Sequence, residues 1–137
     1  MKHELEASWM SGMGFETDFQ GHHVVVDTDE NFGGKNRGMR PKPLLLLSLA
    51  GCTGMDVVSI LEKMRVPIDD LKIKVSGELT EEHPKHYHKI HIVYLVKGKD
   101  LNESKVEKAV NLSQDRYCGV SAMLKKAAEI TYEIIYE

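Results

Sequence analysis

Hydrophobic and polar positions alternate through the first part of the chain, as they do in β-strands with one buried face. The alternation runs through residues 4–9 and again through residues 15–19, where Phe15, Thr17 and Phe19 share a face. Turns rich in glycine separate these runs, and a third apolar run follows at residues 24–26. The pattern predicts a meander of three strands.

A long apolar stretch then begins at Pro43 and ends before Pro67. Proline is accepted in the first turn of a helix, and a later proline ends one. Nearly every residue between the two is apolar or small, so we expect a long central helix that protein surrounds on most sides. The uninterrupted apolar run is shorter than the roughly 20 residues of a membrane span, and we expect no membrane partner. One polar stripe follows the helix and consists of Ser48, Cys52, Asp56, Ser59 and Lys63.

Beyond Pro67, apolar and polar residues alternate again over residues 71–79 and 90–96. This pattern predicts a hairpin with a polar tip. Asn102 is a suitable N-cap for a helix over residues 103–112. After a break at 113–117 we expect a helix from about 118 to 128 and a last strand over 130–136. The order βββ-α-ββ-αα-β predicts an α+β fold with largely antiparallel sheet, in a single domain over residues 1–137.

The segment between the third strand and the central helix, residues 27–39, is polar and contains three glycines. This composition predicts an exposed, mobile loop, and loops of this length inside a compact domain are usually functional or disordered. Two arginines, Arg37 and Arg40, stand where the loop meets the helix.

Charge and cysteine usage limit the classes of partner. The formal net charge is −3 and no basic stripe is present, which argues against nucleic acid as the main partner. Residues 1–6 lack the apolar core of a secretory signal, and we expect a soluble, cytoplasmic protein.

The two cysteines, Cys52 and Cys118, are the principal candidates for chemistry. In a reducing cytosol they are either inert core residues or a redox pair that is oxidised only during turnover. Cys52 lies on the polar stripe between Gly51 and Gly54, and Cys118 is expected at a helix start, where backbone N–H groups favour a thiolate. A thiolate that attacks a peroxide becomes a sulfenic acid, which a second thiol within disulfide reach condenses to a disulfide.

Asp56 lies one helical turn from Cys52, and its negative charge opposes a thiolate there. A cation has to offset this charge, and the candidates are Arg37, Arg40 and Arg116. Four histidines surround the expected hairpin tip, but a solvated tip explains them, so we expect neither a metal nor a cofactor. These histidines are His83, His86, His88 and His91.

Two sequence blocks together resemble the osmotically inducible protein C / organic hydroperoxide resistance (OsmC/Ohr) family. They are residues 43–53, PLLLLSLAGCT, and residues 112–121, LSQDRYCGVS. The resemblance implies an intertwined homodimer with two central helices at its core and active sites at the subunit interface. It also implies that Cys52 is the peroxidatic thiol and Cys118 the resolving thiol, acting on a small organic hydroperoxide with a dithiol reductant.

The chain departs from the peroxidase members of that family at three places. Lys42 stands ten positions before Cys52, where those members carry a glutamate. The expected turn at residues 11–14 contains no arginine, and Gly119 follows Cys118 where the family usually has proline. In their place, Arg40 is our candidate for the group that stabilises the Cys52 thiolate and the charge developing on oxygen.

The sequence thus leaves two main hypotheses for function, and a third in which the protein is a structural interaction module with unreactive thiols. The first is a thiol-dependent peroxidase with Cys52, Cys118 and Arg40 as catalytic residues, acting in oxidative stress defence. The alternative, favoured by the missing glutamate, is a non-peroxidase OsmC-like protein that binds or carries a thiol metabolite or a small electrophile.

Overall fold

The computed structural model describes residues 1–137 and divides them into two compact units, Met1–Leu45 and Leu46–Glu137. The boundary between the units falls inside the central helix α1 (Pro41–Lys63), which begins two residues before Pro43. Whether the chain forms a single domain stays a prediction.

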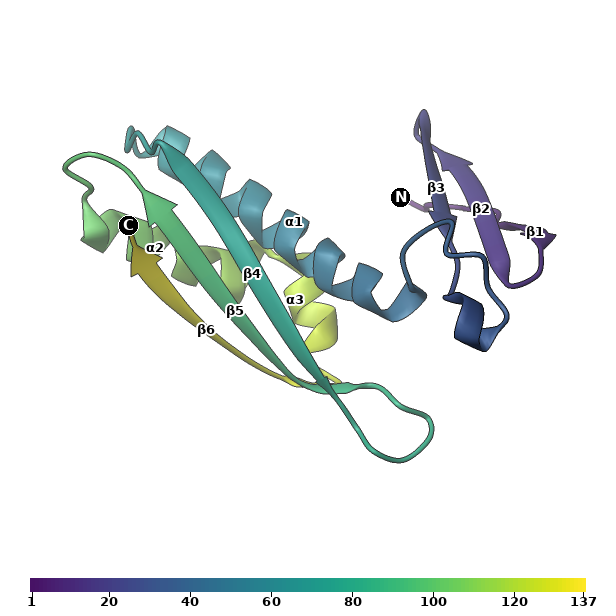
Figure 1. The fold of residues 1–137 in the computed structure, drawn as a ribbon. Coiled ribbons are helices and arrows are strands. Elements are labelled where there is room, and N and C mark those ends of the chain that lie inside the picture. Colours follow the sequence, from purple (N-terminus) through teal and green to yellow (C-terminus); the bar gives the residue numbers. More distant parts are fainter. The chain divides into compact units, whose positions relative to one another are not determined.

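The first unit contains the predicted meander. Strands β1 (Ser8–Ser11), β2 (Gly14–Phe19) and β3 (His22–Val26) form an antiparallel sheet in the order β1-β2-β3 (Figure 1). Gln20 and Gly21 both have positive φ, which is the geometry of the two-residue turn that suits the twist of a hairpin. The prediction of a buried face is wrong for the first strand, because Trp9 is 68% exposed.

The segment between β3 and α1 is more ordered than its composition predicts. It contains a short 3₁₀ helix, η1 (Glu30–Phe32), and a bridge between Val26 and Met39. A side chain at Gly34 would lie 2.0 Å from the carbonyl oxygen of Thr28, so only glycine allows this close approach of backbone.

Asp27 is the centre of that segment, and it is only 2% exposed. Its carboxylate accepts hydrogen bonds from the backbone N–H groups of Thr28, Lys35 and Arg37 at 2.8, 3.3 and 3.2 Å, and from Arg37 Nε at 2.8 Å. The Arg37 guanidinium holds the pKa of Asp27 well below its usual range. The expectation of an exposed, mobile loop is therefore wrong, because one buried carboxylate connects both ends of the segment.

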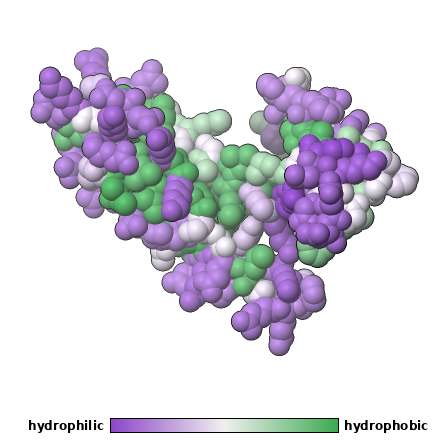
Figure 2. Space-filling view, viewed as in Figure 1, coloured by the Kyte–Doolittle hydropathy of each residue, from purple (hydrophilic) through white to green (hydrophobic).

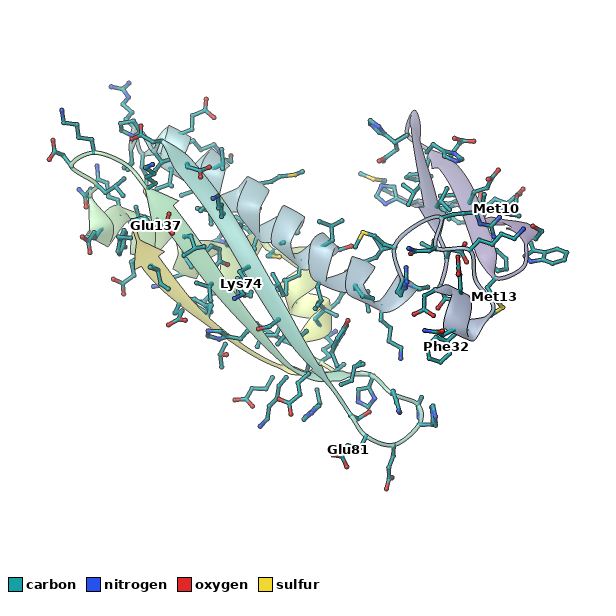
Figure 3. All side chains as sticks on the ribbon, viewed as in Figure 1. Met10, Met13, Phe32, Lys74, Glu81 and Glu137 are labelled. Carbon is teal, nitrogen blue, oxygen red and sulfur yellow. The ribbon has the colours of Figure 1, made fainter.

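The second unit has a sheet covered on one face by helices. Strands β4 (Asp70–Leu79), β5 (Tyr87–Lys97) and β6 (Glu129–Tyr136) lie in the order β4-β5-β6. The predicted hairpin of β4 and β5 is antiparallel, whereas β5 and β6 run parallel. Figure 3 shows Glu81 at the tip of that hairpin and Lys74 among the exposed side chains of β4.

The helices that follow β5 explain the parallel pairing. They are α2 (Glu103–Leu112), the π-helical turn η2 (Ser113–Tyr117) and α3 (Gly119–Leu124). The Asn102 side chain caps α2 as predicted, accepting a hydrogen bond from Lys105 N at 3.1 Å. In Figure 1 these elements lie on the same face of the sheet as α1, and they carry the chain back to the end of the sheet where β5 begins. The α+β fold class is thus confirmed.

The core of the second unit lies between the helices and the sheet. It contains four alternate residues of β5 and residues of α1 and α2, with final-strand residues packed around it. The buried side chains are Leu49, Val57, Leu61, Val66, Ile90, Ile92, Tyr94, Val96, Val106, Ala109, Val110 and Cys118.

Within the single chain, α1 is buried along one stripe only. Leu49, Thr53, Val57 and Leu61 recur every fourth residue and face the sheet. On other sides Leu47, Met55 and Val58 are exposed, Met55 by 76%, and Figure 2 shows apolar surface in this unit between hydrophilic areas. The expectation that protein surrounds the helix on most sides is wrong for one copy of the chain.

By length and composition alone, α1 is also apolar enough to cross a membrane. The helix has 23 residues and is therefore longer than the uninterrupted apolar run that it contains. What ties this helix to the sheet is its stripe of fully buried core residues.

Candidate functional site

The two cysteines meet on the helical side of the second unit. Cys52 lies in the middle of α1 and Cys118 directly precedes α3. The two Sγ atoms and a carboxylate oxygen of Asp56 all lie within 4.8 Å of one another. Both cysteines are free thiols, Cys118 buried and Cys52 partly exposed. The sequence pattern therefore identified a pair of thiols that folding brings together.

The backbone around Cys118 fixes the position of its thiol. Cys118 N–H donates to the carbonyl oxygen of Ser113 at 2.8 Å, which ends the π-helical turn η2. Cys118 then adopts an extended conformation and is the N-cap of α3, where its Sγ accepts a hydrogen bond from Ser121 N at 3.3 Å. The predicted helix start is thus present at this residue.

The helix start favours a thiolate at Cys118 as predicted, but this effect is outweighed by others. Burial is the largest influence and raises the pKa of Cys118 to about 11, although the Ser121 N–H acts in the opposite direction. A hydrogen bond with Cys52 and the charges of Cys52 and Asp56 raise the pKa of Cys118 further. Cys118 therefore keeps its proton at neutral pH, because desolvation outweighs the favourable N-terminal dipoles.

Asp56 occupies the same face of α1 as Cys52, one turn further on. Ser113 Oγ donates a hydrogen bond to Asp56 Oδ2 at 2.9 Å, so the carboxylate is anchored to η2. This contact joins the helix that carries Cys52 to the turn that positions Cys118.

A chain of buried hydrogen bonds continues from Asp56 into the core. Thr53 Oγ1 lies 2.7 Å from Ser113 Oγ and 2.6 Å from the Tyr94 hydroxyl. Gln114 Nε2 donates to the Tyr94 hydroxyl at 2.8 Å and to Thr53 Oγ1 at 3.2 Å. Because Ser113 donates to Asp56, Thr53 donates to Ser113 and Tyr94 donates to Thr53. The hydroxyls are thus all oriented toward the carboxylate beside the thiols.

Sequence reasoning missed this buried network. Its members are Thr53, Tyr94, Ser113 and Gln114, with Ser121 donating to Gln114 Oε1 at 2.7 Å. The available signal was the threonine on the apolar face of α1 and the Ser-Gln pair at an expected break between helices. Nothing in the linear pattern, however, pairs these residues with a tyrosine on β5.

Each of the three candidate cations has its own partners. Arg37 is bound to Asp27 and donates from Nη2 to the carbonyl oxygen of Ser11 at 2.8 Å. Arg116 lies over the ring of Tyr117, with 5.6 Å between the guanidinium carbon and the ring centroid. Both guanidinium groups therefore have defined contacts that involve neither cysteine.

Arg40 is held more loosely, by partners in the first unit. Its Nη1 donates to Asn36 Oδ1 at 2.6 Å and to the carbonyl oxygen of Gly38 at 3.2 Å. Its ion pair with Asp29 is long, at 3.8 Å, and both side chains are more than a third exposed. Of the two arginines that form an ion pair, Arg40 has the longer and more exposed one.

A cavity of about 480 Å³ opens beside Asp56. Leu112 and Tyr117 form one wall and residues of α1 the other, with Lys63 the one cation in its lining. Its full lining is Asp56, Ser59, Ile60, Lys63, Met64, Leu112 and Tyr117. The cavity therefore gives an apolar ligand access to the neighbourhood of the thiols.

The histidines around the β4–β5 tip make separate pairwise contacts. His91 contacts Thr131 Oγ1 at 2.6 Å and Glu133 at 3.3 Å, and His88 lies 3.7 Å from Glu78. The one group of three converging metal-ligating side chains is Cys52, Asp56 and Cys118.

Comparisons with known proteins identify a family and a full-length relative. A family model described as "OsmC-like protein" matches residues 33–133. Protein YhfA of Escherichia coli strain K12 is 33% identical over 135 residues, which cover 96% of this chain and 98% of YhfA.

Solved structures match over nearly the full length. A hypothetical protein from Aquifex aeolicus VF5 has a TM-score of 0.84 and 35% identity, covering 100% of this chain and 99% of that one. The organic hydroperoxide resistance protein OhrB of Bacillus subtilis has a TM-score of 0.67 and 18% identity, with 98% of each chain covered. At that identity the likeness to OhrB shows the fold alone.

Proposed function

The chain belongs to the OsmC-like protein family, and from this premise we propose that it reduces organic hydroperoxides through Cys52 and Cys118. The observation that carries the proposal is the approach of the two sulfur atoms to within 4.8 Å. That distance is short enough for a disulfide to form after a small adjustment of side chains.

The difference in burial between the thiols supports distinct roles. Cys118 is buried and retains its proton, whereas Cys52 is partly exposed on the helix that borders the cavity. The thiolate is the nucleophile in peroxide reduction, so Cys52 is the attacking residue in our proposal. Cys118 is the resolving residue, which needs only to reach the oxidised sulfur.

In the proposed cycle, the Cys52 thiolate attacks the distal oxygen of the hydroperoxide and the O–O bond breaks. The alkoxide takes a proton and leaves as an alcohol, and Cys52 becomes a sulfenic acid. The Cys118 thiol then attacks that sulfur, and the hydroxyl group leaves as water with the Cys118 proton. A dithiol reductant returns two electrons and two protons to the disulfide.

Arg40 is our proposed cation for this cycle. It would offset Asp56 and the negative charge that develops on the peroxide oxygens. The contacts of the three arginines support this choice. Arg37 is bound to buried Asp27, and Arg116 lies over the ring of Tyr117. The ion pair between Arg40 and Asp29 is long and partly solvated.

The lining of the cavity supports an organic rather than an inorganic peroxide. Ile60, Met64, Leu112 and Tyr117 offer apolar surface to an alkyl or aryl group. A substrate such as cumene hydroperoxide would place its polar end near the thiols and its apolar end against these residues.

We also propose that the protein works as a homodimer. Leu47, Met55 and Val58 leave apolar surface on α1 that a second copy of the chain would cover. A side chain added at Gly51 would meet nothing within 4 Å in one chain, which leaves room for close approach of a partner.

Stoichiometric oxidation tests the proposed activity. Reduced protein is treated with one equivalent of cumene hydroperoxide, and its intact mass is measured with peptide mapping of the cysteines. We expect the wild type to lose two hydrogens, Cys118→Ser to gain oxygen at Cys52, and Cys52→Ser to show no change at Cys118. An unmodified Cys52 in the wild type would instead support the alternative, an OsmC-like protein that binds a thiol metabolite or small electrophile.

A further inference from the structure

We propose that the reduced thiol pair and Asp56 form a binding site for a soft divalent cation of the zinc class. The ligand atoms are the Sγ atoms of Cys52 and Cys118 and a carboxylate oxygen of Asp56, which lie within 4.8 Å of one another. A tetrahedral zinc ion holds neighbouring sulfur and oxygen ligands roughly 3.5–3.8 Å apart, as follows from its bond lengths of about 2.0–2.3 Å. The three groups thus need to move inward by only about an ångström.

The backbone fixes the positions of all three ligands before any ion binds. Cys52 and Asp56 are four residues apart on α1, so their side chains project from the same helical face. Cys118 reaches them from the N-cap of α3, where its N–H is bonded to Ser113. Because α1 and the α2–η2–α3 segment share one core, the site does not depend on a flexible loop.

Neighbouring groups also hold two of the ligands in the way that metal sites require. Ser113 Oγ donates to Asp56 Oδ2 at 2.9 Å, which orients the carboxylate. Ser121 N–H donates to Cys118 Sγ at 3.3 Å, a contact that stabilises charge on a ligating sulfur. Such outer hydrogen bonds orient ligands, and their loss typically costs 10–100-fold in metal affinity.

The donor set selects the class of ion. Two sulfurs and one carboxylate favour zinc and cadmium over magnesium and calcium, which prefer oxygen ligands alone. Three protein ligands leave a fourth position for water or an added thiol, and the cavity beside Asp56 gives access to it.

Metal binding and disulfide formation exclude each other at this site. Each thiol that ligates the ion releases its proton to solvent, with no change of oxidation state. A disulfide between Cys52 and Cys118 offers no thiolate, so oxidation of the pair removes both sulfur ligands. The proposal itself requires only reduced thiols and does not rest on peroxidase activity.

Titration of the reduced protein with Cd²⁺, without added thiol, tests the proposal. Charge-transfer absorption from thiolate to cadmium reports sulfur ligation, and native mass spectrometry with Zn²⁺ gives the stoichiometry. We expect one ion per chain, with no charge-transfer band after two-electron oxidation of the pair by diamide. We also expect Cys52→Ser and Cys118→Ser each to lose the wild-type stoichiometry.

Asp56→Asn tests the third ligand, and Glu62→Gln, an exposed acidic residue on the same helix, is the matched control. We expect Asp56→Asn to weaken Cd²⁺ binding about tenfold or more and Glu62→Gln to leave it unchanged. Circular dichroism confirms that each variant is folded. The proposal is overturned by a wild type that binds no ion, by equal affinities of Asp56→Asn and wild type, or by binding that survives Cys52→Ser through the histidines.

Discussion

The side-chain hydroxyl of Thr53 lies 2.6 Å from that of Tyr94, 41 positions away along the chain. Thr53 directly follows Cys52 on α1, and Tyr94 is fully buried in β5. One buried hydrogen bond therefore connects the helix that carries the first thiol to the central strand of the sheet. The stability of this region and the placement of Cys52 depend on the same contact.

Replacing the two partners separately should therefore have unequal effects. Tyr94→Phe leaves Thr53 bonded to Gln114 and Ser113, and we expect it to lower the free energy of unfolding by about 1 kcal/mol. Thr53→Val deprives Tyr94, Ser113 and Gln114 of a partner at once, and we expect a loss of about 2–3 kcal/mol. Urea unfolding measures both.

Thr131→Val is the control for this comparison, because Thr131 is exposed and its hydroxyl contacts only His91. We expect a change within about 0.5 kcal/mol for this variant. Equal losses for Thr53→Val and Tyr94→Phe would contradict the central position of Thr53 in the network.

The raised pKa of Cys118 predicts how stability depends on alkaline pH. The folded protein holds the Cys118 proton up to a pKa of about 11, whereas the unfolded chain releases it near 9.0. Between these values the native state binds more protons, so the free energy of unfolding falls as pH rises from 9 to 11. The stabilisation is fully present below pH 9.

Unfolding of reduced wild type and Cys118→Ser at pH 8 and pH 10 isolates this effect. Tyrosines and lysines titrate in both proteins. The difference between the two proteins in how the free energy of unfolding changes with pH therefore reports the ionisation of Cys118. We expect the wild type to lose more stability on going to pH 10, by on the order of 1 kcal/mol. Parallel pH profiles would show that Cys118 ionises in the folded protein as readily as in the unfolded one.

Arg40→Ala should slow the reaction of Cys52 with cumene hydroperoxide if Arg40 is the cation of the site. Removing a group that stabilises developing negative charge typically costs 10²–10³-fold in rate, and we expect at least about tenfold here. Stopped-flow kinetics measures the rate. Arg116→Ala is the matched control, because Arg116 already lies over Tyr117, and its rate should stay within about twofold of wild type. A rate for Arg40→Ala equal to that of wild type would remove Arg40 from the proposed cycle.

Met55→Glu should convert the proposed homodimer to monomers. Met55 is 76% exposed on α1, and burying a glutamate there against a second chain would be unfavourable. Sedimentation equilibrium over a range of concentrations measures the association. Ile135→Glu, an exposed apolar position on β6, controls for the added charge. The dimer proposal fails if the wild type is monomeric at micromolar concentration.

Much of the fold was predictable because its elements bury regular faces. The alternation of apolar and polar residues predicted β4, β5 and β6 to within three residues of their observed ends, since one face of that sheet is buried and the other is not. Asn102 gave the start of α2 because its side chain caps the helix locally. Such signals are contained within a few residues, so a linear pattern is enough to read them.

The structure departs from prediction where a distant partner decides the outcome. Asp27 looked like one more polar loop residue, yet its contacts with Lys35 and Arg37 order the whole segment. Burial of Cys118 depends on packing in the core with α1 and β5, and it outweighs the expected effect of the helix N-terminus on the pKa of the thiol. Both cases depend on tertiary contacts that no local spacing encodes.

The candidate site shows the same division. The two cysteines could be chosen as candidates for chemistry from their residue type alone, and the structure places the sulfur atoms of Cys52 and Cys118 within 4.8 Å of each other. The hydroxyl network through Ser113 was not predictable, because it requires the register of α1 against β5 and the π-helical form of η2. Sequence thus located the reactive atoms but not the framework that positions them.

The parallel pairing of β5 and β6 has a consequence for redesign of this protein. Cys118 is carried by the crossover between those strands, so its distance from Cys52 is set by how many residues the crossover contains and not by the sheet. Deleting one residue of the π-helical turn would rotate the second thiol away from the first while the strand ladder stayed in register. Length variation in this one connection offers a way to separate the two sulfurs without altering either cysteine.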